Sequence, residues 1–294
     1  MALDLKNLTI RSISGIVYIG LIIGAVMWGM EAVAALCSIF IIIGIYEQEK
    51  NSIASYYAGW KKYWIVDTLI ALMILWTMEL SFSSIQSFDT EWYLFTLWLL
   101  LIFTLVRIII QIFADDKEGF RSIAISAFSV IYLAIPLSFF LLLELNIYLH
   151  WMLVAMISMI WINDTGAYLV GSLFGRHKMF PKVSPKKSWE GLVGGWFFNL
   201  LAGVAFFFIF KGNTICNDII GWMIIGSAVT VMATLGDLFE SMIKRSLNIK
   251  DSGNVIPGHG GVLDRIDSLL FVLPTLMLLF VYLMQSVSDS MIID

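Results

Sequence analysis

The stretch that decides the fold is Ser14–Tyr46, SGIVYIGLIIGAVMWGMEAVAALCSIFIIIGIY, an almost unbroken apolar run whose one charged side chain is Glu31. A single helix of this length would be about 50 Å long, far beyond the ~30 Å hydrocarbon core of a bilayer. The stretch is therefore predicted to form two membrane-spanning helices, joined by a tight turn near Gly29–Glu31.

The rest of the chain has a membrane-protein composition. Of its 294 residues, 60% are hydrophobic and 14% charged, with a mean hydropathy of +0.88, whereas soluble domains are about half apolar and about a quarter charged. We predict an all-α polytopic integral membrane protein that forms a single membrane domain over residues 1–294. Nine transmembrane helices are expected at roughly 13–30, 32–46, 63–79, 92–113, 122–145, 149–173, 190–210, 218–236 and 266–285.

The basic residues predict the orientation of these spans. With the N-terminus in the cytoplasm and the C-terminus outside, all of the 18 Lys and Arg residues except Lys211 fall in cytoplasmic segments, as the positive-inside rule requires. Trp and Tyr residues near span ends, such as Trp60 and Trp92, are expected to be interfacial anchors. No cleavable signal peptide is expected, and Cys37 and Cys216 are not expected to form a disulfide.

Two segments concentrate the polar residues of the second half, Trp161–Gly195 and Gly236–Ser268. In the later one, Asp237, Ser241 and Lys244 have the spacing that places them on one face of a helix. A carboxylate, a hydroxyl and an ammonium group on one stripe suit a metal-bound phosphate, because each contributes a different contact.

A glycine-rich loop follows this helix and ends in His259-Gly260-Gly261. Glycine lets backbone N–H groups approach an anion closely. Asp264 and Asp267 come next, at i and i+3 at the start of the ninth span, so both can point into one cavity.

Ionisable groups beside apolar spans are costly unless they are paired, metal-bound or wet. Oxygen ligands without cysteine favour Mg²⁺ over Zn²⁺, and we predict that Asp237 and Asp264 are the metal ligands. A pair of metal ions there could stabilise the attacking and leaving oxygens of an in-line displacement on a polyphosphate. For individual basic residues, such as Lys178 and Lys182, contact with anionic lipid heads stays an open alternative.

The earlier segment is predicted to supply the opposite wall of the site. Asn163 and Asp164 lie near the inner end of the sixth span, where hydrogen bonding between helices is the alternative role. Either Ser184 or Ser188 can cap the seventh span. The paired lysines between those serines, Lys186 and Lys187, would neutralise phosphate charge.

The run Ser241–Asp267, S-x-I-K-R-x4-K-D-x-G-x2-I-P-x-H-G-G-V-x-D-R-I-D, resembles the signature of phosphatidate cytidylyltransferases, also called CDP-diacylglycerol synthases. The runs Asn163–Tyr168, Ser184–Gly191 and Gly236–Ser241 are similar to that family as well, with Ser188 where Thr is more usual. The close resemblance covers the last half of the chain.

The resemblance implies a Mg²⁺-dependent reaction of phospholipid biosynthesis, in which CTP and phosphatidic acid give CDP-diacylglycerol and pyrophosphate. It implies that residues 147–294 are the catalytic half, with a polar cavity facing the cytoplasm, and that residues 1–146 supply the N-terminal spans. It also implies Asp237 and Asp264 as metal ligands, Asp267 as a helper, and a second, monovalent cation such as K⁺.

The implied substrate contacts come from both polar segments. Phosphate groups would be bound by Lys186, Lys187, Lys244 and Arg245, with hydroxyl contacts from Ser184, Ser188 and Ser241. Further contacts are expected from Asn163, Asp164, His259, Gly260, Gly261 and Arg265. His259 is expected to contact phosphate or shape its loop rather than act as a base, because a phosphomonoester is already largely ionised near neutral pH.

Three other functions stay open. A CTP-dependent kinase of the polyprenol or dolichol type would share the nucleotide chemistry but phosphorylate an alcohol. An anion transporter would carry its charges near the bilayer midplane, and a lipid-binding scaffold would need no turnover. We expect a homodimer in the inner membrane of a bacterial cell, with membrane lipids and no nucleic acid as partners.

Overall fold

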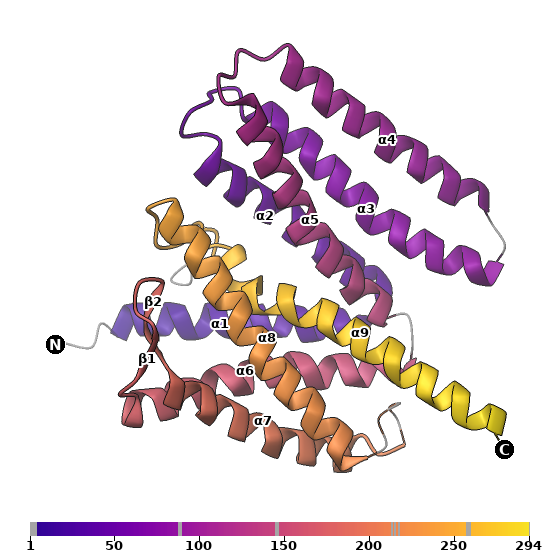
Figure 1. Cartoon of the computed structure of the whole chain (residues 1–294), viewed down its shortest axis with the longest axis vertical. Coiled ribbons are helices and arrows are strands. Elements are labelled where there is room, and N and C mark those ends of the chain that lie inside the picture. The colour runs from indigo at the N-terminus through magenta and orange to yellow at the C-terminus, as the bar shows by residue number, and fades with distance from the viewer. Residues whose placement is uncertain are drawn as a thin grey trace. The chain divides into compact units, whose positions relative to one another are not determined.

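The computed structural model describes residues 5–87, 90–144, 147–212, 214, 216, 218–256 and 260–293. The helices within these residues are α1 (Leu5–Trp28), α2 (Met30–Ser52), α3 (Lys61–Ser87), α4 (Thr90–Ile112), α5 (Gly119–Glu144), α6 (Ile147–Phe174), α7 (Trp189–Ile209), α8 (Ile219–Ser246) and α9 (Leu263–Ile293) (Figure 1). Seven of them are long and apolar enough to cross a bilayer. The predicted all-α polytopic membrane architecture is confirmed.

The break inside the first apolar run lies at Gly29, as predicted. Its φ of 113° falls in a region that side chains with a Cβ rarely adopt. The Gly29 carbonyl accepts hydrogen bonds from the N–H groups of Ala32 and Val33, so α2 begins directly after α1 ends. The two helices are therefore separate elements, and each has a length that suits a single bilayer crossing.

The chain forms two compact units, each of which combines distant parts of the sequence. The first unit contains Met1–Leu142 and Asp251–Arg265, and the second contains Leu143–Lys250 and Ile266–Asp294. Helix α9 begins in the first unit and continues in the second.

A buried ionic network connects three helices of the first unit. The Arg107 guanidinium in α4 donates to Asp67 of α3 at 3.1 Å, to Gln111 at 2.9 Å and to Ser126 of α5 at 2.9 Å. It also lies 3.8 Å from the ring centroid of Tyr63. A buried charge is tolerated only when it is paired and hydrogen-bonded, and this arrangement meets that condition.

The second unit is built on close packing of α6 against α7. A Cβ at Gly191 would lie 2.9 Å from the Ala167 carbonyl oxygen, and one at Gly194 would collide with Val170. Only glycine therefore allows this approach of the two backbones.

A short antiparallel hairpin, β1 (Lys178–Phe180) and β2 (Ser184–Ser188), connects α6 to α7 at one end of the pair (Figure 1). The sequence-based prediction contained no strand. Pro181 and Pro185 explain why this segment is not helical, since proline lacks the N–H that a helix interior uses.

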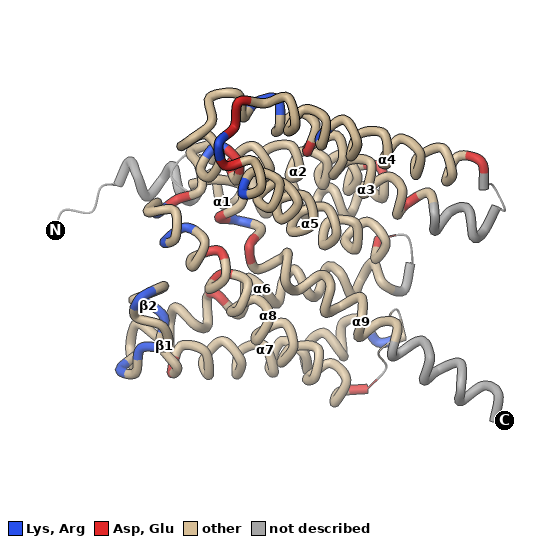
Figure 2. The backbone as a smooth tube through the Cα atoms, turned by 45° about the horizontal axis from the view of Figure 1, so that its top comes forward, with Lys and Arg blue, Asp and Glu red and all other residues tan. Residues whose placement is uncertain are grey.

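Basic residues gather at helix ends within each unit (Figure 2). In the first unit they lie at the end of α2 and at the starts of α3 and α5, and in the second they lie on the hairpin and at the end of α8, whereas Lys211 lies at the far end of α7. The two cysteines, Cys37 and Cys216, are free and buried.

Candidate active site

A cavity of about 610 Å³ lies in the second unit, between α6, the hairpin, α7 and α8. Its volume is within the range of about 300–1,000 Å³ that is usual for small-molecule sites. The cavity joins the two polar segments that were predicted to form opposite walls. Its lining includes six of the predicted site residues, namely Asn163, Asp164, Lys186, Lys187, Ser188 and Asp237.

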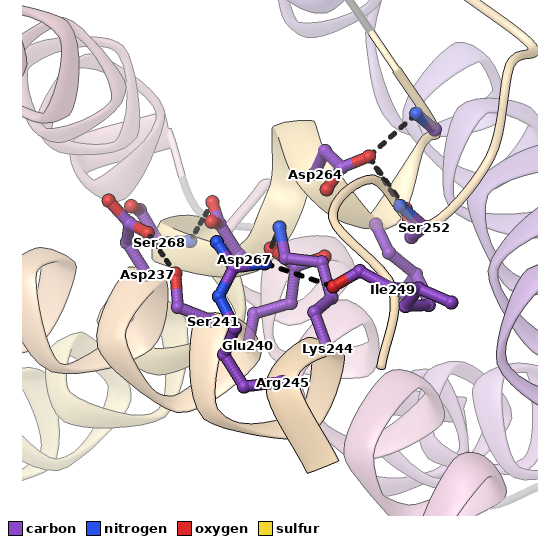
Figure 3. Close-up of polar contacts among 12 residues, drawn as sticks. Asp237, Glu240, Ser241, Lys244, Arg245, Ile249, Ser252, Asp264, Asp267 and Ser268 are labelled. Carbon is purple, nitrogen blue, oxygen red and sulfur yellow. Dashed lines mark hydrogen bonds and ion pairs between the residues drawn. The ribbon is translucent and has the colours of Figure 1, made fainter. Parts of the chain in front are cut away.

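Asp237 is one of the two carboxylates that line this cavity, the other being Asp164. The Asp237 Oδ2 lies 2.7 Å from the Lys187 ammonium nitrogen, and the Asp237 Oδ1 accepts a hydrogen bond from Ser241 at 3.2 Å (Figure 3). The bond to Ser241 confirms that these two residues share one face of α8. The Asp237 side chain is 40% exposed, so it is accessible to a ligand although it already has a cationic partner.

Two further carboxylates lie beside Asp237. Asp267 is buried in α9, and its carboxylate faces Asp237 and Glu240. Its oxygen accepts a hydrogen bond from the Ser268 N–H at 2.6 Å, while Glu240 pairs with Lys244 at 2.8 Å. Carboxyl groups this close need a nearby cation or a bound proton, because an uncompensated buried charge is strongly destabilising.

Asp267 reaches this position because α9 lies directly against α8. A Cβ at Gly236 would come within 2.5 Å of the Asp267 carbonyl oxygen. The Ser268 hydroxyl donates to the Ala233 carbonyl of α8 at 3.1 Å. Gly236, one residue before Asp237, is therefore what permits the close contact of the two helices.

Two predicted contact residues have structural partners. Ser188, not Ser184, caps α7, because its hydroxyl accepts from the Gly191 N–H at 3.2 Å. Arg245 donates to the carbonyl oxygens of Ile249 at 3.0 Å and Val183 at 3.4 Å, so it connects the end of α8 to the hairpin.

Asn163 is buried against α7. Its amide oxygen has no hydrogen-bond partner and lies where a Cβ at Gly195 would be. The same side chain lines the cavity, so this oxygen is a candidate acceptor for a ligand.

The glycine-rich loop and Asp264 belong to the first unit. Asp264 Oδ2 accepts hydrogen bonds from the Ser252 N–H at 2.9 Å, the Ser252 hydroxyl at 2.9 Å and the Gly261 N–H at 2.7 Å (Figure 3). Gly260 has a φ of 84°, and a Cβ there would lie 2.6 Å from the same oxygen. The loop thus donates N–H groups to an anion, and that anion is the carboxylate of Asp264; contact of the loop with a substrate phosphate stays a prediction.

The two remaining predicted residues of the loop region are His259 and Arg265. His259 lies outside the described residues. Arg265 is exposed, and its carbonyl oxygen accepts a hydrogen bond from Tyr18 at 2.8 Å.

Sequence reasoning missed Glu47 of α2. Its carboxylate accepts hydrogen bonds from the N–H groups of Val262 and Leu263, each at 3.1 Å, and from the Ser252 hydroxyl at 3.3 Å. The one signal in the sequence was an acidic residue directly after the second apolar run. Nothing local indicates that its partners are more than 200 positions away.

The fold and this site define a class, a multi-pass helical membrane protein with lysines and carboxylates around a cavity that suits a phosphate-bearing ligand. Residues 9–283 match the Cytidylyltransferase family, and the chain belongs to that family.

Several relatives are named phosphatidate cytidylyltransferase. The chain is 38% identical over 174 residues to the one from Staphylococcus aureus (strain COL), an alignment that covers 58% of this chain and 64% of the relative. It is 51% identical over 119 residues to the one from Haemophilus influenzae, covering 40% and 41%. For the protein from Thermotoga maritima the identity is 37% over 174 residues, covering 56% and 62%. The chain therefore spans less than two thirds of the length of each of these three relatives.

Proposed function

We propose that this protein is a phosphatidate cytidylyltransferase of phospholipid biosynthesis, which converts CTP and phosphatidic acid to CDP-diacylglycerol and pyrophosphate. The observation that carries the proposal is the cavity in which Lys187 and Asp237 form an ion pair beside Lys186. The family and the names of the relatives supply the nucleotide and the lipid.

In the proposed reaction, an oxygen of the lipid phosphate attacks the α-phosphorus of CTP. A new P–O bond forms, the bond between the α- and β-phosphates breaks, and pyrophosphate leaves. Lys186 and Lys187 bind phosphate oxygens and compensate their charge. The chain needs no general base for this step, because the attacking phosphomonoester is already ionised.

Mg²⁺ belongs to this proposal, with Asp237 and Asp264 as its ligands. Among the described residues no three His, Cys, Asp or Glu side chains are arranged to hold a metal ion by themselves. Carboxylate oxygens are nevertheless ligands that suit Mg²⁺, which is usually held by one or two carboxylates together with waters and substrate phosphates. When bound, the ion would neutralise developing charge on the phosphates.

We also propose that the protein lies in the inner membrane of a bacterial cell with its active site facing the cytoplasm. The hairpin, which carries basic residues of the second unit, borders the cavity and has the charge of a cytoplasmic segment. A homodimer and a second cation such as K⁺ are implied by the resemblance.

Purified protein in detergent, CTP and phosphatidic acid provide the direct test. Label on the α-phosphate of CTP is expected to enter the lipid with release of an equal amount of pyrophosphate, and EDTA is expected to stop the reaction until Mg²⁺ is added in excess. Transfer of label from the γ-phosphate to an added polyprenol, with release of CDP, would instead identify a lipid kinase. No turnover of CTP under either condition would disprove the proposal.

A further inference from the structure

We propose that Glu47 is the positioning residue of Asp264, which places a site determinant in α2, far from the sequence signature. The inference rests on the proposed function for its activity readout, but its geometric basis is independent of that function. All contacts involved lie within the first unit.

Glu47 is a carboxylate buried near the end of an apolar helix, with 2% of its surface exposed. Such a group requires strong hydrogen-bond partners to be tolerated. Its two oxygens find them in the N–H groups of Val262 and Leu263. These groups lie at the start of α9, where the first N–H groups have no partner within the helix.

Glu47 of α2 therefore caps the N-terminus of α9, a role that a side chain directly before the helix usually has. A carboxylate at a helix N-terminus also interacts favourably with the helix dipole. The helix that it caps carries Asp264 in its first turn, so the position of Glu47 determines where this turn begins.

A shared hydroxyl connects Glu47 to Asp264 more directly. The Ser252 Oγ lies 3.3 Å from Glu47 Oε2 and 2.9 Å from Asp264 Oδ2. Asn51, one helical turn after Glu47, donates to the Ser252 carbonyl at 2.6 Å. One face of α2 thus holds Ser252 from two sides, and Ser252 in turn holds the Asp264 carboxylate.

Two glycines of the loop leave the space that the Glu47 carboxylate occupies. A Cβ at Gly261 would lie 2.5 Å from its carboxylate oxygens, and one at Gly253 would collide with it. Two carboxylates thus meet at this loop: Glu47 of α2 supports it from the inside, and Asp264 of α9 is the group that would bind the metal.

Glu47→Gln is the most direct test, because it keeps the size of the side chain but replaces one acceptor oxygen by an NH₂ group that faces an N–H donor. We expect turnover to fall about 10- to 100-fold, as is usual when a group that orients a metal ligand is lost, while the KM for CTP stays near its wild-type value. Glu47→Asp, which keeps the charge but is shorter, is expected to recover part of the activity.

The metal readout does not depend on activity. Mg²⁺ should raise the melting temperature of the wild-type protein in detergent, because a ligand that binds only the folded state stabilises it. In Glu47→Gln, about ten times more Mg²⁺ should be needed for the same rise. Glu31→Gln is the matched control, since Glu31 is exposed at the other end of α2, and it should behave as wild type.

The outcomes separate the two proposals. A wild-type protein that makes no CDP-diacylglycerol contradicts the proposed function, whatever the Mg²⁺ titrations show. An active wild type with unchanged turnover and Mg²⁺ response in Glu47→Gln overturns the role of Glu47. If Glu47→Gln does not fold, Ser252→Ala decides, because it removes only the shared hydroxyl; a normal Mg²⁺ response in that variant would equally refute the inference.

Discussion

At the scale of single residues, the site depends on how charges are shared. Asp237 is within 2.7 Å of Lys187 and also faces the buried carboxylate of Asp267. A ligand that brings both a cation and phosphates can compensate the charges of Asp237, Asp267 and Lys187 better than these side chains compensate one another. The cation would bind the carboxylates, and Lys187 would turn to a phosphate oxygen.

Asp237→Asn and Asp264→Asn are each expected to lower turnover by more than about 100-fold, since loss of a supporting contact alone typically costs about 10- to 100-fold. Neither change adds volume, and asparagine keeps one acceptor oxygen at each position, so the fold should be retained. Initial rates in saturating Mg²⁺ and melting curves of the same samples provide the measurement.

The control for these variants is Asp115→Asn, which neutralises an exposed carboxylate in the connection between α4 and α5. It should keep wild-type activity. Near-normal turnover in Asp237→Asn or Asp264→Asn would show that the proposed metal ligand is wrong.

At the scale of elements, local sequence patterns predicted those features that depend on residues close together in the chain. The break at Gly29, a serine cap on α7 and the pairing of Asp237 with Ser241 all involve residues at most four positions apart. The pairs Lys187–Asp237 and Glu47–Leu263 could not be predicted individually, because spacing along a helix carries no information on which distant element packs against it. The hairpin was missed because its strands, of three and five residues, lie in a polar connection between two spans and are too short to show a clear strand pattern.

Gly236→Ala tests the contact of α8 with α9. Alanine normally favours a helix over glycine by about 0.5–1 kcal/mol, but here the added Cβ would meet the Asp267 carbonyl oxygen at 2.5 Å. Overpacking typically costs about 1–3 kcal/mol, so we expect a lower melting temperature in detergent together with reduced turnover.

Gly24→Ala in α1 is the matched comparison, because a Cβ there meets nothing within 4 Å. This variant should be as stable as wild type or slightly more stable. Equal melting temperatures and equal activities for the two variants would mean that the close contact at Gly236 does not constrain the site.

At the scale of the whole molecule, the division of Ser14–Tyr46 into two helices decides the side on which every later segment lies. If α1 and α2 each cross the bilayer, the N-terminus and the basic loops lie in the cytoplasm and the C-terminus lies outside.

Fusions to the full-length chain can test this topology. A fluorescent protein that matures only in the cytoplasm should be bright at the N-terminus and dark at the C-terminus, whereas alkaline phosphatase, active only outside, should be active at the C-terminus. A bright fluorescent protein at both ends would require an even number of crossings. One of the first two helices would then lie in the membrane interface instead of crossing the bilayer. A reversal later in the chain would not explain the result, because it would place basic segments such as Lys186–Lys187 outside, against the positive-inside rule. The same rule places the cavity on the cytoplasmic side, where CTP would be available.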